Sequence, residues 1–373
     1  MINRAVNIGN LLEKNKVLII YGPKQVGKTT LLKKFLEKTE LKSLYYTGGQ
    51  LDFAHDIGSC DLSLIRKIIG DNKLLVIDEA QKIENIGTAL KLIVDNMDNV
   101  FVIATGSSSF DLASATDEPL TGRKNIITLY PVSVLELAKK ETEYEIDRQA
   151  EDYLIYGMYP EIVSSNSYEK KKNRLIEIKD AYLIKDILTF QKVKSSKLIV
   201  DLLKLLAFQV GNQVSTSDLG SKLGVDYKTV VRYLDLLEKS FILYRLDGFS
   251  RNLRKEVGKM SKYYFYDLGI RNALISNFNQ LSSRNDRGQL WENFLIMERI
   301  KRNSYTSTYA NYYFWRTYDQ KEIDLIEERE GALHGYEFKW KKGNEKPPED
   351  WMKAYDNADY SVIDRENYLK FIL

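Results

Sequence analysis

Apolar runs alternate with amphipathic stretches through the first 130 residues of the chain. The runs lie at residues 16–21, 43–47, 73–78, 100–105 and 125–129, and unbroken apolar runs of this kind are typical of strands that are buried on both faces of a parallel sheet. Between them, apolar residues recur at helical spacing, as in residues 30–36 and 62–69. The pattern predicts an α/β domain with a parallel sheet over residues 1–130.

From Pro131 onward the hydrophobic pattern becomes helical, and we expect a helical lid over residues 131–194. Residues 195–270 then show a short helix that closes in a glycine turn, a second helix and two strands, the order found in a winged helix-turn-helix. The second helix is expected over residues 226–239, with a core face made of Val230, Val231, Leu234 and Leu237.

The last part of the chain, residues 284–373, predicts a further α/β domain. An amphipathic helix is expected at residues 290–299 and a strand at residues 312–316. Apolar and polar residues then alternate in residues 322–326 and 335–340, which predicts two half-buried strands joined as a hairpin.

Bulk composition narrows the class of protein. The chain has 373 residues, of which 44% are hydrophobic and 29% charged, so we expect a soluble globular protein of two to four domains. One cysteine, Cys60, and two histidines, His55 and His334, exclude a disulfide framework and a Cys/His zinc site. No apolar run approaches the roughly 20 residues of a membrane helix, so the expected location is the cytoplasm, without a membrane partner.

One loop between a predicted strand and a predicted helix matches the phosphate-loop pattern G-x-x-x-x-G-K-[ST]. Glycines let the backbone N–H groups turn toward phosphate oxygens, the lysine reaches the β and γ phosphates, and the hydroxyl side chain binds Mg²⁺. We therefore expect ATP or ADP with Mg²⁺ as cofactors. The candidate nucleotide-binding residues are Gly22, Pro23, Lys24, Gln25, Val26, Gly27, Lys28, Thr29 and Thr30.

Two carboxylates, Asp78 and Glu79, end the predicted strand 73–78 at the same sheet edge as this loop. Asp78 would hold Mg²⁺ through water, beside Thr29. Glu79 would orient and deprotonate the attacking water, because phosphoryl transfer depends mainly on positioning. The alternative is that the pair only caps a helix.

Two further residues of this domain are weaker candidates. Thr105 and Ser107 follow the strand 100–105 and are predicted to sense the γ-phosphate or the water, unless the serines only cap a helix. Arg123 precedes the strand 125–129 and is a candidate for stabilising transition-state charge, in the same subunit or in a neighbouring one, so a homo-oligomer is one expected state. An ordinary surface arginine is the alternative.

Basic residues cluster between the two predicted wing strands. The segment 245–262 holds six cations against two carboxylates, and such a wing would neutralise DNA phosphates and make binding depend on salt. Winged helices also serve as protein-docking modules, so both partners remain open. The charged residues are Arg245, Arg251, Arg254, Lys255, Lys259 and Lys262 against Asp247 and Glu256.

The predicted C-terminal hairpin places carboxylates and a lysine together. Asp324 lies in its first strand, Glu337 and Lys339 share one face of its second strand, and Glu292 comes from the preceding helix. Such a set is a candidate Mg²⁺ nuclease site with Glu292, Asp324 and Glu337 as metal ligands and Lys339 beside the attacking water. The alternative is a solvated, charged sheet face.

In combination, these motifs resemble the prokaryotic AAA-type ATPases that carry a C-terminal domain of unknown function similar to PD-(D/E)XK nucleases. The resemblance covers nearly the whole chain. It implies an ATPase domain, a winged helix and a restriction-endonuclease-like domain in which Asp324, Glu337 and Lys339 cut DNA; the usual Pro-Asp is here Ile323-Asp324. The residues that carry it are the phosphate loop, 75–81, 105–109, 120–123, 130–133, 157–161, 264–269, 291–294, 313–316, 322–324 and 337–339.

Two functions follow from these observations. The first is a Mg²⁺-dependent ATPase that binds DNA through the winged helix and cleaves it with the C-terminal domain. The second is an ATP-driven switch or scaffold whose winged-helix and nuclease-like domains only bind a protein or nucleic-acid partner.

Overall fold

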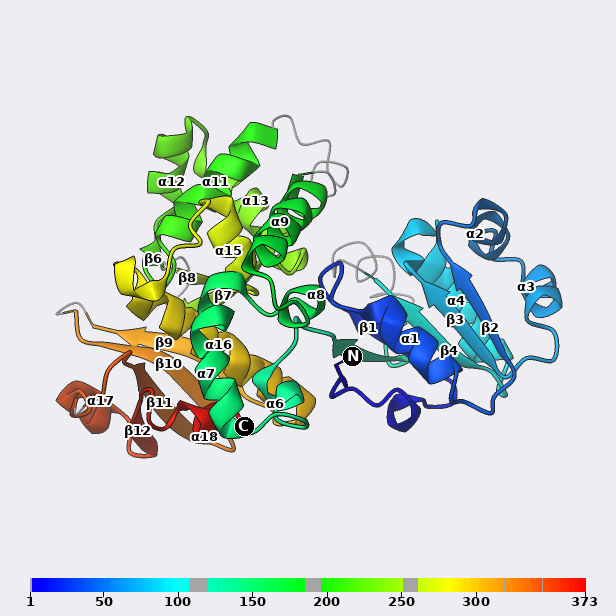
Figure 1. Cartoon of the computed structure of the whole chain (residues 1–373). Helices are drawn as coiled ribbons and strands as arrows, with labels where there is room; N and C mark the ends of the chain where they lie inside the picture. Colours follow the sequence, from blue (N-terminus) through cyan, green and yellow to red (C-terminus); the bar gives the residue numbers. More distant parts are fainter. Residues whose placement is uncertain (1, 107–119, 185–195, 251–260, 318–319, 344) are drawn as a thin grey trace. The chain divides into compact units, whose positions relative to one another are not determined.

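The computed structural model describes residues 2–106, 120–184, 196–250, 261–317, 320–343 and 345–373 (Figure 1). Its residues form two compact units, each with a sheet of its own. The N-terminal unit contains Arg4–Tyr130, and the C-terminal unit contains Pro131–Glu238 and Ile242–Leu373. The predicted α/β class is confirmed.

The N-terminal unit is built on a five-stranded, wholly parallel sheet in the order β2-β3-β4-β1-β5. The strands are β1 (Val17–Tyr21), β2 (Ser43–Thr47), β3 (Leu74–Asp78), β4 (Phe101–Thr105) and β5 (Lys124–Thr128), and the helices are α1 (Lys28–Leu36), α2 (Leu51–Gly58), α3 (Leu62–Ile69) and α4 (Ile86–Asn96). Every residue of β1 and β3 is buried. Because all strands run the same way, the residues that follow β1, β3 and β4 meet at one edge.

The C-terminal unit has a seven-stranded sheet in the order β12-β11-β10-β9-β7-β8-β6. Its strands are β6 (Gln213–Val214), β7 (Leu243–Gly248), β8 (Ser261–Phe265), β9 (Asn311–Arg316), β10 (Glu322–Arg329), β11 (Ala332–Phe338) and β12 (Ala358–Ile363). The pairing of β7 with β9, at Asp247 with Tyr313 and Gly248 with Phe314, joins the strands of the predicted wing to those of the predicted nuclease-like region. The two regions therefore share one sheet.

Most helices of the C-terminal unit come before or between these strands in the sequence. Figure 1 shows α11, α12 and α13 at one end of the unit and β10 to β12 at the other. The helices are α6 (Val134–Leu137), α7 (Glu143–Tyr156), α8 (Pro160–Val163), α9 (Tyr168–Ile178), a π-helical turn (Lys179–Ile184), α11 (Ser196–Phe208), α12 (Thr216–Leu223), α13 (Tyr227–Lys239), α15 (Leu268–Leu274), α16 (Arg287–Tyr305), α17 (Glu349–Ala354) and α18 (Tyr368–Ile372).

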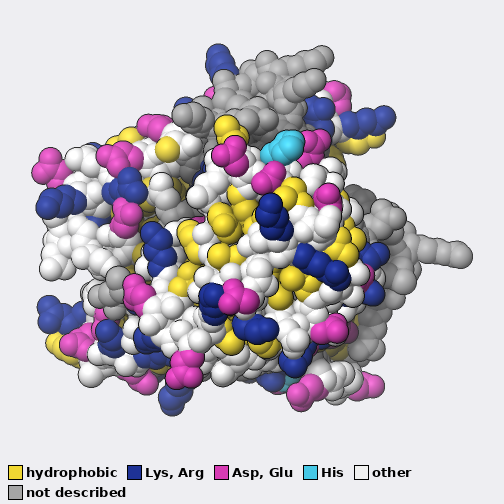
Figure 2. Space-filling view, turned by 90° about the vertical axis from the view of Figure 1, so that its right-hand side faces the viewer, with side chains coloured by type: hydrophobic (Ala, Val, Ile, Leu, Met, Phe, Trp, Pro, Cys, Tyr) yellow, Lys and Arg dark blue, Asp and Glu magenta, His cyan; other side chains and the backbone are white. Residues whose placement is uncertain are grey.

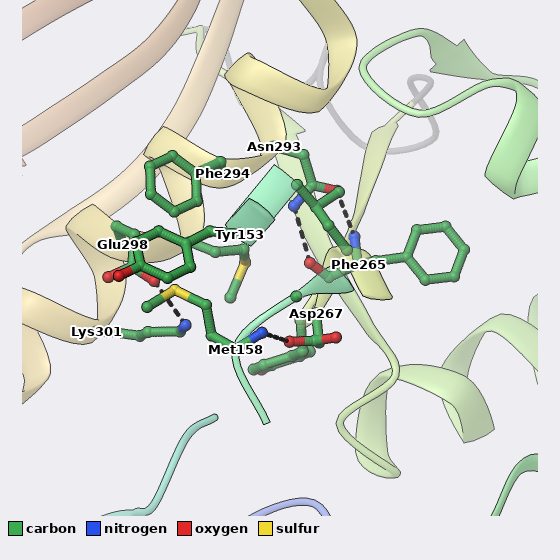
Figure 3. Close-up of a pocket in the computed structure, with 12 residues that line it drawn as sticks. Tyr153, Met158, Phe265, Asp267, Asn293, Phe294, Glu298 and Lys301 are labelled. Carbon is green, nitrogen blue, oxygen red and sulfur yellow. Dashed lines mark hydrogen bonds and ion pairs between the residues drawn. The ribbon is translucent and has the colours of Figure 1, made fainter. Parts of the chain in front are cut away.

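Helix α16 is buried along most of its length, and the buried residues include polar ones such as Asn293, Glu298 and Arg299. Asn293 is bonded in both directions to the Phe265 backbone of β8, with both donor–acceptor distances at 2.8 Å (Figure 3). The Arg299 guanidinium donates to both oxygens of Glu327 on β10, at 2.6 and 2.8 Å. A buried polar group costs free energy unless it is hydrogen-bonded, so these contacts fix the helix on the sheet.

The same helix holds the first residues of the C-terminal unit. Glu298 accepts from the Val134 N–H at 2.7 Å, and the Lys301 ammonium donates to Glu298 at 2.7 Å and to the Val132 carbonyl at 3.1 Å. Figure 3 shows Glu298 and Lys301 together beside a small cavity that Asp267 and Met158 also line. The segment that follows Tyr130 is therefore fastened to α16.

Two expectations for the winged-helix region are wrong. Val231, expected in the core, is 47% exposed, whereas Tyr233 and Leu236 are buried, because α13 is rotated relative to the predicted face. Lys262, counted among the basic wing residues, is buried, and its ammonium pairs with carboxylates. The wing residues Arg251, Arg254, Lys255, Glu256 and Lys259 lie outside the described residues.

On the face shown in Figure 2, the positively charged side chains of the described residues do not form a separate patch. There, Lys and Arg side chains are interspersed with Asp and Glu side chains around an apolar area. Among the helices of the described residues, none combines the length and apolar character needed to cross a membrane.

Candidate functional site

The loop from Gly22 to Thr29 leaves β1 and enters α1, as the motif requires. Gly22 has φ +148°, and a β-carbon on it would lie 2.1 Å from the Leu129 carbonyl oxygen, so only glycine fits. Gly27 has φ +96°, a left-handed conformation, directly before the helix begins at Lys28. The first N–H groups of a helix have no intrahelical acceptor, so α1 presents donors to this loop.

Lys28 is a buried cation whose hydrogen bonds run to backbone carbonyls. Its side chain is 8% exposed, and Nζ donates to the carbonyl oxygens of Gly22 at 2.7 Å and Pro23 at 2.8 Å. Burial lowers the pKa of Lys28 to about 7, although Asp78 and Glu79 oppose this shift by attraction. A nearby anion would stabilise the charged form of this side chain.

Asp78, at the end of β3, is the centre of a hydroxyl network. Its Oδ2 accepts from Thr29 Oγ1 at 2.6 Å and from the Tyr45 hydroxyl at 2.9 Å, and its Oδ1 accepts from Thr105 Oγ1 at 2.5 Å. The predicted set of Thr29, Asp78 and Thr105 is thus brought together. Tyr45, on β2, was missed because its role depends on which strand lies beside β3.

Glu79 has an unusual backbone conformation for a non-glycine residue. Its φ of 52° and ψ of 45° are left-handed, and its N–H donates to Thr105 Oγ1 at 3.1 Å. Its carboxylate forms an ion pair with Lys82. Glu79 therefore lies at the predicted edge, in a strained conformation of the kind that clusters at functional sites.

Arg4 joins the loop to the end of the N-terminal unit, a role that the sequence analysis did not assign. Its guanidinium donates to the Val26 carbonyl at 2.5 Å and to the Tyr130 carbonyl at 2.6 Å. A residue that reaches across more than a hundred positions to backbone carbonyls leaves no local sequence pattern.

The remaining candidates in this unit differ in position. Lys24, Gln25 and Thr30 lie in the loop and the first turn of α1, whereas Ser107 lies outside the described residues. Arg123 pairs with Asp95, and its carbonyl accepts from Val17, the first residue of β1. The loop follows the other end of β1, roughly 13 Å away at about 3.3 Å per residue. Arg123 is therefore not brought to the phosphate loop of its own unit.

The C-terminal hairpin forms as predicted from β10 and β11, which pair antiparallel with Leu325 opposite Tyr336. Asp324 accepts from the Phe338 N–H at 2.9 Å, and Lys339 donates to Glu337 at 2.7 Å. Burial raises the pKa of Asp324 well above its usual range, and the neighbouring Glu292 and Glu337 raise it further. The predicted residues Glu292, Asp324 and Glu337 thus meet at one place, where Glu322, which was not predicted as a site residue, joins them. We call Glu292, Glu322, Asp324 and Glu337 the carboxylate cluster.

Lys262 of β8 enters this cluster. Its side chain is 1% exposed, and Nζ lies 3.2 Å from Glu292 Oε1, 3.9 Å from Asp324 Oδ1 and in ion-pair contact with Glu322. Burial lowers its pKa, but attraction to these carboxylates outweighs burial and raises the pKa above its usual value. The ammonium is therefore the central cation of the cluster.

The predicted metal ligands Glu292, Asp324 and Glu337 do not form a ready metal site. Within the described ranges, no group of three His, Cys, Asp or Glu side chains is placed to hold one metal ion. The physical reason is visible in the contacts: Glu292 Oε1 is already bonded to Lys262 and to the Tyr264 hydroxyl, the latter at 2.6 Å.

Three family models match successive parts of the chain. Residues 14–138 match a model described as AAA domain, residues 147–281 match Domain of unknown function (DUF8612), and residues 287–369 match Domain of unknown function (DUF4143). The match to DUF8612 begins within the predicted lid, which was expected at residues 131–194, and contains all of the predicted winged helix, residues 195–270.

Similar proteins occur in bacteria and archaea. Uncharacterized protein Rv2008c of Mycobacterium tuberculosis is 27% identical over 347 residues, which cover 90% of this chain and 73% of that protein. Uncharacterized protein MJ1544 of Methanocaldococcus jannaschii is 25% identical over 377 residues, with coverage of 96% and 81%.

Solved structures with partial similarity include a Signal Transduction ATPase with Numerous Domains (STAND) protein of Pyrococcus horikoshii. The similarity covers 79% of this chain and 46% of that one, at 13% identity and a TM-score of 0.28. A DNA replication initiation factor shares 15% identity over 70% of this chain and 88% of that one, with a TM-score of 0.23.

The phosphate loop, the parallel sheet and the matched model agree for the first part of the chain. Residues 14–138 form an AAA-type P-loop ATPase domain.

Proposed function

We propose that the chain is a Mg²⁺-dependent ATPase that binds DNA without cutting it. The single observation that carries the ATPase assignment is Lys28, a buried ammonium that is hydrogen-bonded to loop carbonyls, at the N-terminus of α1. Such a cation fits a nucleoside triphosphate, because it lies beside Gly22, where a β-carbon has no room, and beside Gly27, whose φ of +96° favours glycine.

In this proposal, Lys28 and the loop N–H groups hold the phosphates of ATP. Thr29 and Asp78, already hydrogen-bonded to each other, would hold Mg²⁺, which neutralises phosphate charge when bound. Thr105 keeps Asp78 in place and also bonds the Glu79 N–H. Glu79 orients the attacking water once its carboxylate leaves Lys82.

Two variants test the ATPase assignment. Lys28→Ala should abolish binding of a fluorescent ATP analogue, and Glu79→Gln should keep binding while steady-state phosphate release stops. Lys33→Ala, an exposed lysine on the same helix, is the matched control and should retain both activities. Phosphate release by Glu79→Gln at the wild-type rate would refute the role of Glu79.

Arg123 is proposed to act on a second copy of the chain. It lies at the opposite end of the strands from its own phosphate loop and pairs with Asp95. An arginine supplied in trans is a known way to stabilise charge in phosphoryl transfer. If so, Arg123→Ala should lower turnover only at concentrations where wild-type chains associate, as measured by light scattering.

DNA binding is proposed for the exposed side of α13. Tyr227, Lys228, Val231 and Arg232 are exposed along one stripe of this helix, which follows α12 after a turn with Gly224 in a left-handed conformation. A second helix after such a turn is the element that enters a major groove in helix-turn-helix proteins. Two cations and two apolar groups on one stripe suit phosphate and base contacts.

A salt titration tests this surface. Lys228→Ala/Arg232→Ala should weaken duplex binding and reduce the slope of log K against log salt by about two, one for each phosphate contact. Lys353→Ala, an exposed lysine of α17 that pairs with Glu349, is the control and should not change the slope. A duplex affinity that stays flat between roughly 50 and 200 mM salt would count against DNA.

Binding without cleavage is the proposal that the carboxylate cluster supports best, because Lys262 contacts oxygens that a metal would need. Supercoiled plasmid incubated with the wild-type chain and Mg²⁺ or Mn²⁺ should stay intact. Nicking that is lost in both Asp324→Ala and Lys339→Ala would instead establish the nuclease function.

A further inference from the structure

We propose that Lys262 is the resident counter-ion of the carboxylate cluster and that its ammonium keeps divalent cations out. This inference rests on the proposed function, since it explains why a nuclease-like arrangement would bind DNA without cutting it. The inference concerns the cluster alone and does not involve the nucleotide site.

The ammonium of Lys262 lies among carboxylates that come from more than one element. Nζ contacts three carboxylates that come from two elements, Glu292 of α16 and both Glu322 and Asp324 of β10. Divalent cations need carboxylate oxygens at about 2.0–2.6 Å. A metal bound to these oxygens would therefore lie next to a buried ammonium, and the two cations would repel each other in a poorly solvated place.

Strand β8 directs two of its side chains at the same carboxylate. Side chains alternate along a strand, so positions 262 and 264 share one face. Lys262 and Tyr264 both contact Oε1 of Glu292. Because Asn293 of α16 is bonded to the backbone of Phe265, the strand and the helix are held in register at this point.

The other lysine beside the cluster, Lys339, pairs with different carboxylates. Lys339 is 35% exposed and pairs with Glu337 and, at 3.8 Å, with Glu345. The second oxygen of Glu337, Oε2, is buried without a hydrogen-bond partner in the part of the chain that the structure describes. Arg316 of β9 also pairs with Glu322, at 3.3 Å, whereas the ion pairs of Glu292 and Asp324 within the described residues are made with Lys262. Neutralisation of Glu292 and Asp324 therefore depends on Lys262.

Manganese binding tests the proposal directly. The full chain, free of nucleotide and carrying Asp78→Asn to remove the metal ligand of the ATPase domain, is titrated with Mn²⁺ and followed by electron paramagnetic resonance. This background should show no Mn²⁺ site that depends on Asp324. Adding Lys262→Met should create one Mn²⁺ site per chain, with an affinity at least tenfold above that of any residual Mn²⁺ binding in the background. Adding Asp324→Asn as well should remove this site.

The matched control is Lys301→Met in the same background. Lys301 is also buried, and it pairs with Glu298 away from the cluster. Its replacement should lower the melting temperature without creating a Mn²⁺ site. A Mn²⁺ site in the Asp78→Asn background that Asp324→Asn abolishes, or a folded Lys262→Met variant that binds no additional Mn²⁺, would overturn the proposal.

A second measurement covers the case in which Lys262→Met folds but unfolds at too low a temperature for the Mn²⁺ titration. The added change Glu292→Gln removes one of the carboxylates left without a cation. Under the proposal, Glu292→Gln lowers the melting temperature of the wild-type chain but raises that of Lys262→Met, measured by circular dichroism. If Glu292→Gln lowers both, Lys262 is not the counter-ion of this cluster.

Discussion

Each candidate site of this chain is built around a buried lysine, but the two lysines have opposite surroundings. Lys28 is hydrogen-bonded to the carbonyls of Gly22 and Pro23, and burial lowers its pKa to about 7. Lys262 contacts three carboxylates, and their attraction raises its pKa. A bound anion would stabilise the cation Lys28 at the first site, whereas at the second site Lys262 already pairs with carboxylates.

The difference shows why a motif and a cluster of similar residues can have different functions. A buried charge is costly unless it is paired, so Lys28 is stabilised when phosphate is added. The carboxylate cluster gains nothing comparable from a divalent cation while Lys262 is present. An ion-binding site is therefore recognised by a buried charge that is not yet paired with a charge of opposite sign.

Removing Lys28 should have the largest effect and should affect activity alone. Lys28→Met is expected to lower ATP turnover by roughly 1,000-fold, about 4 kcal/mol, because a donor to the developing phosphate charge is lost. Its melting temperature should equal or exceed that of the wild type, since a costly buried cation is gone. A clear fall in melting temperature without nucleotide would contradict the comparison.

Removing Lys262 should lower stability and leave ATP turnover unchanged, the reverse of the outcome expected for Lys28. Lys262→Met should destabilise the C-terminal unit by about 3 kcal/mol or more, because the half-buried Glu292 and Asp324 lose the cation that they pair with and Glu322 is left with Arg316. ATP turnover per folded chain should stay near the wild-type value. Denaturant unfolding followed by tryptophan fluorescence measures the first quantity, and phosphate release at low temperature measures the second.

Asp267 extends the comparison to an anion that lacks a directly bonded cation. Burial raises its pKa to about 6, although N–H donors such as that of Met158 and the charge of Lys301 oppose the shift. The native state thus binds the proton of the Asp267 carboxyl more tightly than the unfolded chain does, because in the unfolded chain the pKa of this carboxyl is near 3.8. The resulting stabilisation is full below about pH 4 and is lost as the pH rises through 6.

The variant Asp267→Asn cannot titrate and should remove this pH dependence. Relative to wild type, the variant should gain about 2–3 kcal/mol as the pH rises from about 4 to 7. Melting curves at matched ionic strength measure the difference. A difference that does not change with pH would show that the carboxyl stays ionised in the native state.

The smallest effect is expected from Arg4, whose guanidinium donates to two backbone carbonyls beside the phosphate loop. Arg4→Ala removes hydrogen bonds to Val26 and Tyr130 and should weaken ATP binding by about 1–2 kcal/mol, roughly five- to thirtyfold. The loss should appear in KM more than in kcat, because Arg4 positions the loop. Arg4→Lys should restore only part of the affinity, since lysine cannot donate to both carbonyls in the fork geometry.

The features that could be predicted without a structure are those formed by residues close together in the sequence. The phosphate loop, Asp78 with Glu79, and the hairpin that joins Asp324 to Glu337 depend on backbone periodicity and on residues close in sequence. Their geometry follows from the strand and helix repeats themselves.

The partners of these residues were decided by tertiary structure. Lys262 meets Glu322 because β8 and β10 belong to one sheet, and it meets Glu292 because α16 is hydrogen-bonded to β8. Arg4 is hydrogen-bonded to Tyr130, which lies 126 positions away in the sequence. Val231 is exposed and Arg123 lies away from its own phosphate loop for the same reason: helix rotation and strand order come from long-range packing. The sequence alone therefore determined where the charges are, whereas the fold decided which charge neutralises which, since pairing depends on distance and burial.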